Sequence, residues 1–163
     1  MNTKRTHHGF SLIELLPTLA IMAVLAALVV PLLGDNDALR IDVARRLLIS
    51  DLEHAQILAI TNPEEAIGIV VDDDGQGWHI ASLEDSSIPL NDSITGEPLE
   101  IDLGSGPASS ADSVYVETNA VSNTISFNQF GGLSDFSQSI QLTLVSGEKS
   151  ALITISPSTG SIE

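Results

Sequence analysis

The sequence predicts an α+β fold in which a long N-terminal helix packs against an antiparallel β-sheet. Three observations support this prediction. An uncharged run occupies residues 15–33, and an amphipathic helical pattern follows it as far as residue 62. Short β-like runs separated by turn residues then fill positions 63–163. A chain of 163 residues is long enough for one domain with a sizeable core.

The charge distribution excludes several functions. The chain has 22 acidic and 6 basic residues, and the stretch from Leu47 to Glu163 holds 18 acids beside the single base Lys149. Phosphate contacts need clustered Lys and Arg, so nucleic-acid binding is not expected. The hydrophobic content of 43% argues against a disordered acidic chain. The absence of cysteine excludes disulfides and thiolate catalysis.

The uncharged run predicts a membrane-spanning helix. Its 19 residues, at about 1.5 Å each, nearly cross a hydrocarbon core of about 30 Å. The run is longer than the apolar region of an ordinary secretory signal. Pro17 and Pro31 fall inside it, and each removes an amide donor, so we expect a kinked helix.

Glu14 is a carboxylate one turn into this apolar segment. A charge at mid-bilayer costs roughly 2.5–3.5 kcal/mol, so such a residue usually has a partner. The alternative is that Glu14 belongs to the interfacial flank, where the cost is smaller. The residues alone leave both interpretations open.

Residues 9–14, Gly-Phe-Ser-Leu-Ile-Glu, resemble the prepilin peptidase signal of type IV pilins and type II secretion pseudopilins. The resemblance implies cleavage after Gly9 and N-methylation of the new N-terminal Phe10. It also makes Glu14 the assembly glutamate, which pairs with the α-amine of a neighbouring subunit's Phe10. Such a pair strengthens in a low dielectric when its geometry is good.

The two prolines relate to the family differently. Pro31 falls where the family commonly has proline, whereas Pro17 stands where an aliphatic residue is usual. Pro17 is therefore a departure from the pattern, and we expect it to weaken the first helical turns.

The resemblance also implies an organisation and a location. The expected location is the inner membrane, with a single span and the C-terminal domain in the periplasm; counting Lys and Arg does not by itself decide this orientation. The implied partners are other pseudopilins or pilins, the prepilin peptidase and N-methyltransferase, and the inner-membrane assembly platform, with no cofactor. The expected segments are a leader at 1–9, the transmembrane half of the helix at 10–33, its amphipathic half at 34–62 and a β-rich domain at 63–163.

The amphipathic half shows apolar residues at steps of three and four, which predicts one buried helical face. Helix-capping residues at 35–37 precede it, and Thr-Asn-Pro at 61–63 ends it. If both halves are continuous, the helix is roughly 75 Å long. The predicted buried positions are Ile41, Ala44, Leu48, Leu52, Ala55 and Ala59.

Beyond Pro63 the pattern predicts strands and turns. Residues 83–112 are rich in Ser, Pro, Gly and Asp, which indicates a long loop with room for one short strand. Turns are expected at 128–134, 146–149 and 156–161. The predicted strands are 66–71, 78–82, 113–117, 124–128, 139–145 and 151–156.

This second part resembles the H-type minor pseudopilin domain, which also occurs in minor type IV pilins. The similarity rests on the helix pattern at 44–60, the segment Asn123 to Gly131, and the closing segment 153–162, where Ser161 replaces a frequent Arg. It implies a structural subunit of the type II secretion pseudopilus that supports protein export across the outer membrane. The alternative is a minor type IV pilin that primes pilus assembly. We see no catalytic motif, so an enzyme is not expected.

Asp72, Asp73 and Asp74, followed by a glycine, suggest a calcium loop as a weak hypothesis. Calcium loops alternate their ligands and add a distant bidentate acid, which is missing here. A tight Asp-Gly hairpin between two strands explains the same residues. Of two nearby aromatic residues, Phe127 is expected in the core and Phe130 is a candidate partner contact.

Overall fold

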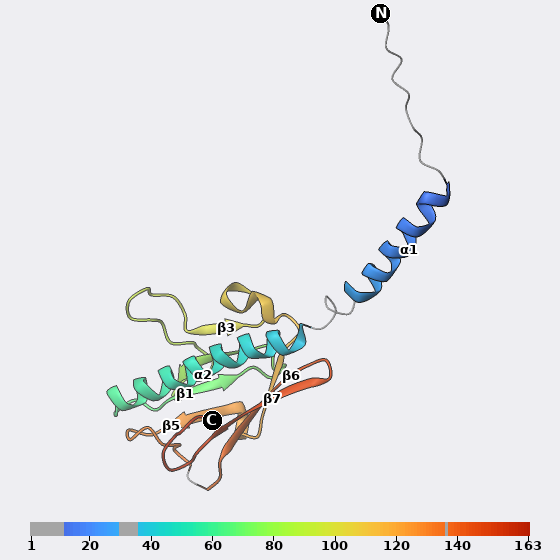
Figure 1. Ribbon diagram of the computed structural model, residues 1–163. Coiled ribbons are helices and arrows are strands. Elements are labelled where there is room, and N and C mark those ends of the chain that lie inside the picture. Colours follow the sequence, from blue (N-terminus) through green and yellow to red (C-terminus); the bar gives the residue numbers. More distant parts are fainter. Residues whose placement is uncertain (1–11, 30–35, 136) are drawn as a thin grey trace, which may run out of the picture. The chain divides into compact units, whose positions relative to one another are not determined.

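The computed structural model describes residues 12–29, 36–135 and 137–163. The chain divides into two compact units, Met1–Asn36 and Asp37–Glu163. The described part of the first unit contains one helix, and every strand that the structure describes lies in the second unit (Figure 1).

Helix α1 spans Leu12–Val29 and contains Glu14 and Pro17. The predicted processing residues Gly9 and Phe10, together with Pro31, lie outside the described residues. The continuous helix considered from the sequence also runs through residues outside the described part, so its continuity stays a prediction.

Helix α2 spans Asp37–Thr61, and the predicted apolar face is confirmed. An acid in its first turn complements the positive end of the helix dipole. At the other end, the Thr61 hydroxyl donates to the carbonyl of Ile57 at 2.9 Å, and Pro63 prevents continuation. The buried positions of α2 are the six predicted ones, Ile41, Ala44, Leu48, Leu52, Ala55 and Ala59.

The first sheet has four strands in the order β3-β2-β1-β5, all antiparallel among the described residues. At its centre Ile69 lies opposite Ile80 on one side and Ile125 on the other, and all three are buried. Cross-strand pairs of β-branched residues stabilise such a face. The strands are β1 (Ile67–Val71), β2 (Gly77–Ser82), β3 (Glu100–Asp102) and β5 (Thr124–Phe127).

The second sheet has three strands in the order β4-β6-β7, also antiparallel in the described chain. The sequence predicted one sheet, and this is a correction. The chain crosses to the second sheet after β3, returns for β5, and crosses again for β6, so neighbours in sequence are not always neighbours in space. The strands are β4 (Tyr115–Thr118), β6 (Ile140–Ser146) and β7 (Lys149–Ile155).

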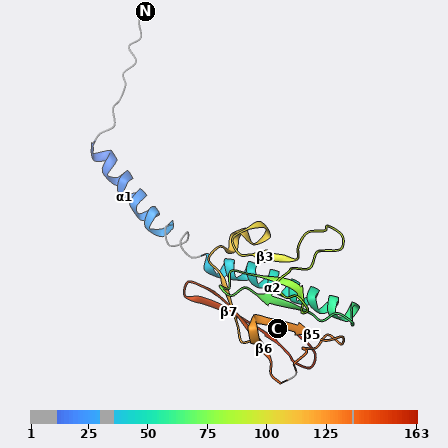
Figure 2. The same cartoon turned by 180° about the vertical axis from the view of Figure 1, so that it is seen from behind.

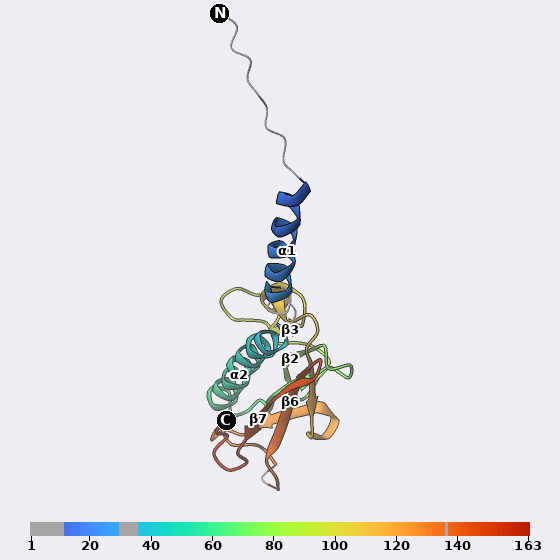
Figure 3. The ribbon, with the colours of Figure 1, turned by 45° about the vertical axis from the view of Figure 1, so that its right-hand side comes forward.

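Helix α2 contacts strands of both sheets, and this packing forms the core (Figures 2 and 3). The predicted α+β arrangement of a helix on antiparallel strands is thereby confirmed. Trp78, Leu48 and Leu52 are among the largest fully buried side chains. The core residues all belong to the Asp37–Glu163 unit, so that unit carries its own hydrophobic core.

The predicted long loop at 83–112 contains more structure than its composition indicates. Besides β3 it includes the 3₁₀ helix η2 (Gly106–Ala111), which contacts α2 and buries Ala108 and Ala111 completely. A further 3₁₀ turn, η3 (Val121–Asn123), leads into β5. Small side chains give weak periodicity, so only their packing against α2 reveals that this segment belongs to the core.

The buried stripe of α2 gives a direct stability prediction. Leu52→Ala removes a side chain with 0% exposure and leaves a cavity, so we expect the free energy of unfolding to fall by about 2–5 kcal/mol. Ile57→Ala on the same helix, at 57% exposure, should change it by no more than about 0.5 kcal/mol. Urea unfolding of residues 37–163 measures both. Equal effects would show that the stripe does not carry the fold.

Candidate assembly surfaces

The exposed apolar face of α1 is the first candidate. Ile13, Leu16 and Met22 are each more than 70% exposed. The Thr18 hydroxyl, next to Pro17, donates a hydrogen bond to the carbonyl of Leu15 at 2.8 Å. Its hydrogen-bonding capacity is therefore used within the helix. Within the described residues, no helix is both long enough and apolar enough to cross a bilayer.

Glu14 lies in the first turn of α1, three residues before Pro17. A carboxylate near a helix N-terminus is favoured by the helix dipole. The predicted pairing of Glu14 with a Phe10 amine involves a residue outside the described part and a second subunit. It therefore stays a prediction.

The three consecutive aspartates occupy the hairpin between β1 and β2. Gly75, at a φ of 69°, donates its amide to the Asp72 carbonyl at 2.9 Å and closes the turn. The carboxylates have separate partners. Asp73 accepts from the Asn123 amide at 3.2 Å, and Asp74 accepts from the backbone amide of Gln76 at 2.9 Å.

Asp72 also lies close to a histidine of β2, His79. Its carboxylate is 3.7 Å from His79 Nδ1, while His79 Nε2 donates to the Ser86 carbonyl at 2.9 Å. Burial raises the pKa of Asp72, and the nearby His79 acts in the opposite direction. In the described part of the chain, no three His, Asp or Glu side chains are grouped to hold a metal ion.

A polar network fixes the first turns of α2 on the second sheet. Arg40 Nη1 donates to Asp112 and to the Ser113 hydroxyl, both at 2.6 Å. Ser113 and the buried Ser146 share a hydrogen bond at 3.1 Å, and Ser146 donates to Asp37 at 3.2 Å. The start of α2 is therefore held by charge-assisted hydrogen bonds in addition to apolar packing.

The last turns of α2 hold two glycine turns together. The Gln56 side-chain amide donates to the carbonyl of Gly131, and it lies 3.3 Å from the carbonyl of Gly160. A Cβ on Gly160, which has a φ of 65°, would collide with the Gly131 carbonyl. The segment that ends at Gly131 and the closing segment 153–162, which both resemble the family, thus meet at Gln56. Sequence reasoning missed Gln56, because no local pattern connects positions so far apart.

Exposed apolar side chains surround this end of α2. Ile57 and Ile60 are about half exposed, and Ile60 lies against the turn at Gly131. Phe130, on the same turn, is 84% exposed, whereas Phe127 is buried in β5 as expected. The exposure of Phe130 is compatible with the predicted partner contact, which stays a prediction.

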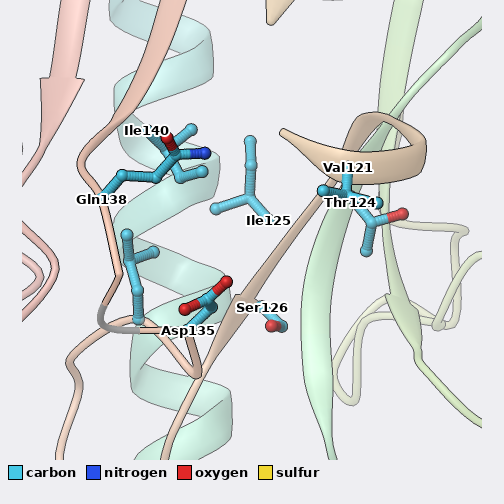
Figure 4. A pocket seen from close by; sticks show the side chains of 8 residues that line it. Val121, Thr124, Ile125, Ser126, Asp135, Gln138 and Ile140 are labelled. Atoms are coloured by element: carbon cyan, nitrogen blue, oxygen red, sulfur yellow. The ribbon is translucent and has the colours of Figure 1, made fainter. Parts of the chain in front are cut away.

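A cavity of about 240 Å³ lies between β5 and the loop before β6 (Figure 4). Ile125 and Ile140 line it together with Asp135, which stands on the loop (Figure 4). A hydrogen bond from the Ser137 backbone lowers the pKa of Asp135. Among its described lining residues there is one carboxylate and no histidine, lysine or arginine. These residues do not form an acid–base pair of the kind that catalysis uses.

Asp51 makes the central polar contact beneath α2. Its carboxylate accepts a hydrogen bond from Trp78 Nε1 at 2.8 Å. Burial raises the pKa of Asp51, and the opposing effects of the Trp78 hydrogen bond and of His54 are smaller. The ionised carboxylate is therefore less favourable in the folded protein than in the unfolded chain.

The sequence matches two protein families. Residues 4–30 match the prokaryotic N-terminal methylation motif. Residues 44–159 match type II transport protein GspH. Both matches agree with the resemblances seen in the residues, and the predicted family is confirmed.

Two crystal structures of the type IV minor pilin FimU from Pseudomonas aeruginosa have a similar fold. One aligns with a TM-score of 0.54 and 22% identity over 75% of this chain and 84% of FimU. The other aligns with a TM-score of 0.50 and 20% identity over 75% and 89%. At these identities the likeness shows the pilin-like fold alone. Comparison with curated proteins gave no match.

The raised pKa of Asp51 predicts a pH-dependent variant effect. The protonated carboxyl of Asp51 contributes its full stabilisation below pH 3.8, the ordinary pKa of an aspartate. This contribution is lost as the pH rises through the raised pKa that Asp51 has in the folded protein. Asp51→Asn cannot ionise, and its amide oxygen can still accept from Trp78. The stability of the variant relative to wild type should therefore increase from below pH 3.8 to neutral pH in urea unfolding. Glu53→Gln, on an exposed position of α2, controls for net charge. A pH-independent difference for Asp51→Asn would contradict this account.

Proposed function

Because the chain belongs to the type II transport protein GspH family and is therefore a minor pseudopilin, we propose that its N-terminal segment anchors it in the inner membrane, with the domain in the periplasm. One observation carries the proposal. A prepilin methylation motif and a GspH domain occur in a single chain, at residues 4–30 and 44–159. The uncharged run at 15–33 overlaps the methylation motif, ends before the GspH domain and supplies an apolar anchor.

We propose that the prepilin peptidase removes residues 1–9 and that Phe10 is then N-methylated. Cleavage before the apolar run leaves the run on the mature subunit, whereas cleavage after it would release the domain. Residues 10–33 then form the transmembrane half of the helix and 34–62 the amphipathic half. Residues 63–163 complete the periplasmic domain.

Assembly in this proposal depends on Glu14. Cleavage creates an α-amine on Phe10 with an ordinary pKa near 7.7–8.0, so it carries positive charge at neutral pH for much of the time. A carboxylate in the first turn of α1 can pair with the amine of a neighbouring subunit when the helices stack. The pair offsets the cost of a buried charge only in the correct register, so it selects the register.

The proposed role of the domain is structural. It would join other pseudopilins and the inner-membrane assembly platform in a short fibre that supports export across the outer membrane. A second candidate is a minor type IV pilin that primes pilus assembly, and the FimU-like fold is the observation in its favour. Co-purification with type II secretion pseudopilins or with pilins distinguishes the two roles.

The processing proposal predicts the effect of a leader substitution. Gly9 has no side chain, so Gly9→Val should block cleavage by filling a narrow peptidase subsite. Intact mass of the membrane-extracted protein should show a wild-type N-terminus at Phe10 and an uncleaved variant. His8→Val keeps the glycine and should be cleaved normally. A mature N-terminus at any other residue would contradict the assignment.

Glu14→Ala should have opposite effects on insertion and assembly. Removing a charge from an apolar segment makes bilayer insertion equal or easier, so membrane yield should not fall. Crosslinking to partner pseudopilins should weaken, because the neighbouring amine loses its carboxylate. Glu14→Gln keeps the shape without the charge and should behave like the alanine variant. Normal crosslinking in both variants would mean that Glu14 is only an interfacial residue.

A further inference from the structure

Strand β7 lies at the edge of the second sheet, where β6 is its one neighbour among the described strands. Part of its other side is used by residues 162–163 (Figure 3). The amide of Thr154 donates to the Glu163 carbonyl at 2.9 Å, and the Glu163 amide donates to the Thr154 carbonyl at 3.0 Å. The outer side of β7 therefore accepts an extended segment in antiparallel pairing at this position.

The same side of β7 is open two and four residues before Thr154. Backbone groups in a strand alternate in direction, so Leu152 and Ser150 point their N–H and C=O groups the same way as Thr154. Neither residue has a hydrogen-bond partner on that side within the described chain. Leu152 is 50% exposed, and Ser150 is exposed as well. We call residues 150–152 the open edge, and its unpaired donors and acceptors are a template for an extended backbone.

The remaining edges of the two described sheets are covered or short. The Val116 amide of β4 donates to the Gly75 carbonyl at 2.9 Å. The Ser126 carbonyl of β5 accepts from the Ser134 amide at 2.9 Å, and β3 has only three residues. Proteins cover or shorten their edges because exposed edges pair with other chains. The open edge is the exception in the part of the chain that the structure describes, and a partner that pairs with it accounts for the lack of cover.

A groove of about 410 Å³ lies beside the open edge, next to the first turns of α2. Ala38 and Ile41 of α2 and Ala151 of β7 form its apolar wall. Side chains of a strand alternate between its two faces, so every second side chain of an added strand would point toward this wall. The groove therefore has room for small apolar side chains of such a strand. Its remaining lining residues are polar, namely Asp42, Arg45, Lys149 and Ser150.

We infer that the open edge binds an extended segment of a different protein chain, which adds to the second sheet as a fourth strand antiparallel to β7. The segment is neutral or basic, and its groove-facing side chains are small and apolar. Backbone hydrogen bonds supply the affinity, and the groove supplies the selection. The inference deepens the proposed structural role, since it states how a neighbouring chain attaches to this domain.

The charge of the domain argues against a second copy as the occupant. From Leu47 to Glu163 the sequence has 18 acids beside Lys149. Glu148 and Glu163 stand near the two ends of the open edge, and both are exposed. A second copy would bring the same carboxylates to the same place, and like charges across an interface are costly. A segment without acidic side chains avoids this repulsion, and lysines at its ends complement the two glutamates.

Residue-resolved hydrogen exchange with a peptide probe tests the inference on the full chain in detergent micelles. The probe is acetyl-Lys-Thr-Val-Thr-Val-Thr-Lys-amide, and its control has Glu in place of both Lys. At saturating probe, exchange at the Leu152 and Ser150 amides should slow at least about fivefold, the equivalent of about 1 kcal/mol for one net hydrogen bond each. Exchange at Ala151 and Ile153, whose amides face β6, should not change. At low salt the control should need a concentration about tenfold higher.

Two substitutions at one position separate backbone pairing from side-chain contact. Leu152→Pro removes an N–H that β6 does not use, so the pairing of β6 with β7 stays intact while strand addition is blocked. Leu152→Thr keeps the N–H and changes only the side chain. The probe should protect the Ser150 amide in the Thr variant and not in the Pro variant. Slow exchange at Ile153 without probe shows that each variant is folded.

A C-terminal extension tests the same edge without any substitution. Thr-Val-Thr-Val added after Glu163 continues the pairing of Glu163 with Thr154 in register. Its second residue then lies opposite Leu152, and its fourth lies opposite Ser150. The extension should protect both amides in the absence of probe, and it should prevent the probe from binding.

Four results would overturn the inference. If the probe protects neither amide, the edge does not bind a separate segment, whatever the extension does. Equal loss of protection in both Leu152 variants would assign the binding to the side chain. Protection that rises with protein concentration alone, together with a dimer in sedimentation, would assign the edge to a second copy. Equal binding of the acidic control would contradict the selection by charge.

The test is independent of processing and of helix pairing. None of these measurements requires cleavage at Gly9 or a partner for Glu14. Failure at the open edge therefore leaves the proposed function standing, and failure of the processing or crosslinking predictions leaves the strand-addition result unchanged.

Discussion

The fold depends on a single buried stripe along α2. One helical face covers two separate sheets, so the same side chains must pack against both sheets. Ala44, Ala55 and Ala59 let the helix approach the strands closely, while Leu48 and Leu52 fill the space between the layers. Close packing of this kind makes changes of even a methylene group costly. Because the stripe is narrow, the rest of the helix surface is left for polar contacts.

Hydrogen bonds from polar side chains of α2 hold the neighbouring segments in place. The Arg40 network holds the start of the helix to the second sheet, Asp51 holds Trp78 beneath its middle, and Gln56 holds two glycine turns at its end. Each of these hydrogen bonds is made by a side chain that lies beside the buried stripe. Helix α2 thereby fixes both ends of the domain, the polar network near its start and the apolar side chains around Phe130 near its end.

The sequence predicted the features that depend on local spacing. The six buried positions of α2 repeat at helical steps, and most strands lie within two residues of their expected bounds. The pairing of β4 with β6 was not predictable, because alternation identifies a strand but not its neighbour. Arg46 and Asp42 are one helical turn apart and form a pair that spacing suggests, whereas Arg40 finds Asp112 seventy-two positions away. The partner of Arg40 therefore emerges only from the fold.

The two halves of the chain differ in how readily their sequences are recognised, because one depends on local spacing and the other on long-range pairing. The N-terminal methylation motif is a linear segment, so residues 4–30 carry it in sequence order. The surface of the folded domain is assembled from distant segments, such as the Gly131 and Gly160 turns joined by Gln56. The buried stripe needs mainly apolar volume, which many sequences supply. A pilin-like fold can therefore persist while its surfaces change, and the identity of each subunit's partners must be determined from those surfaces.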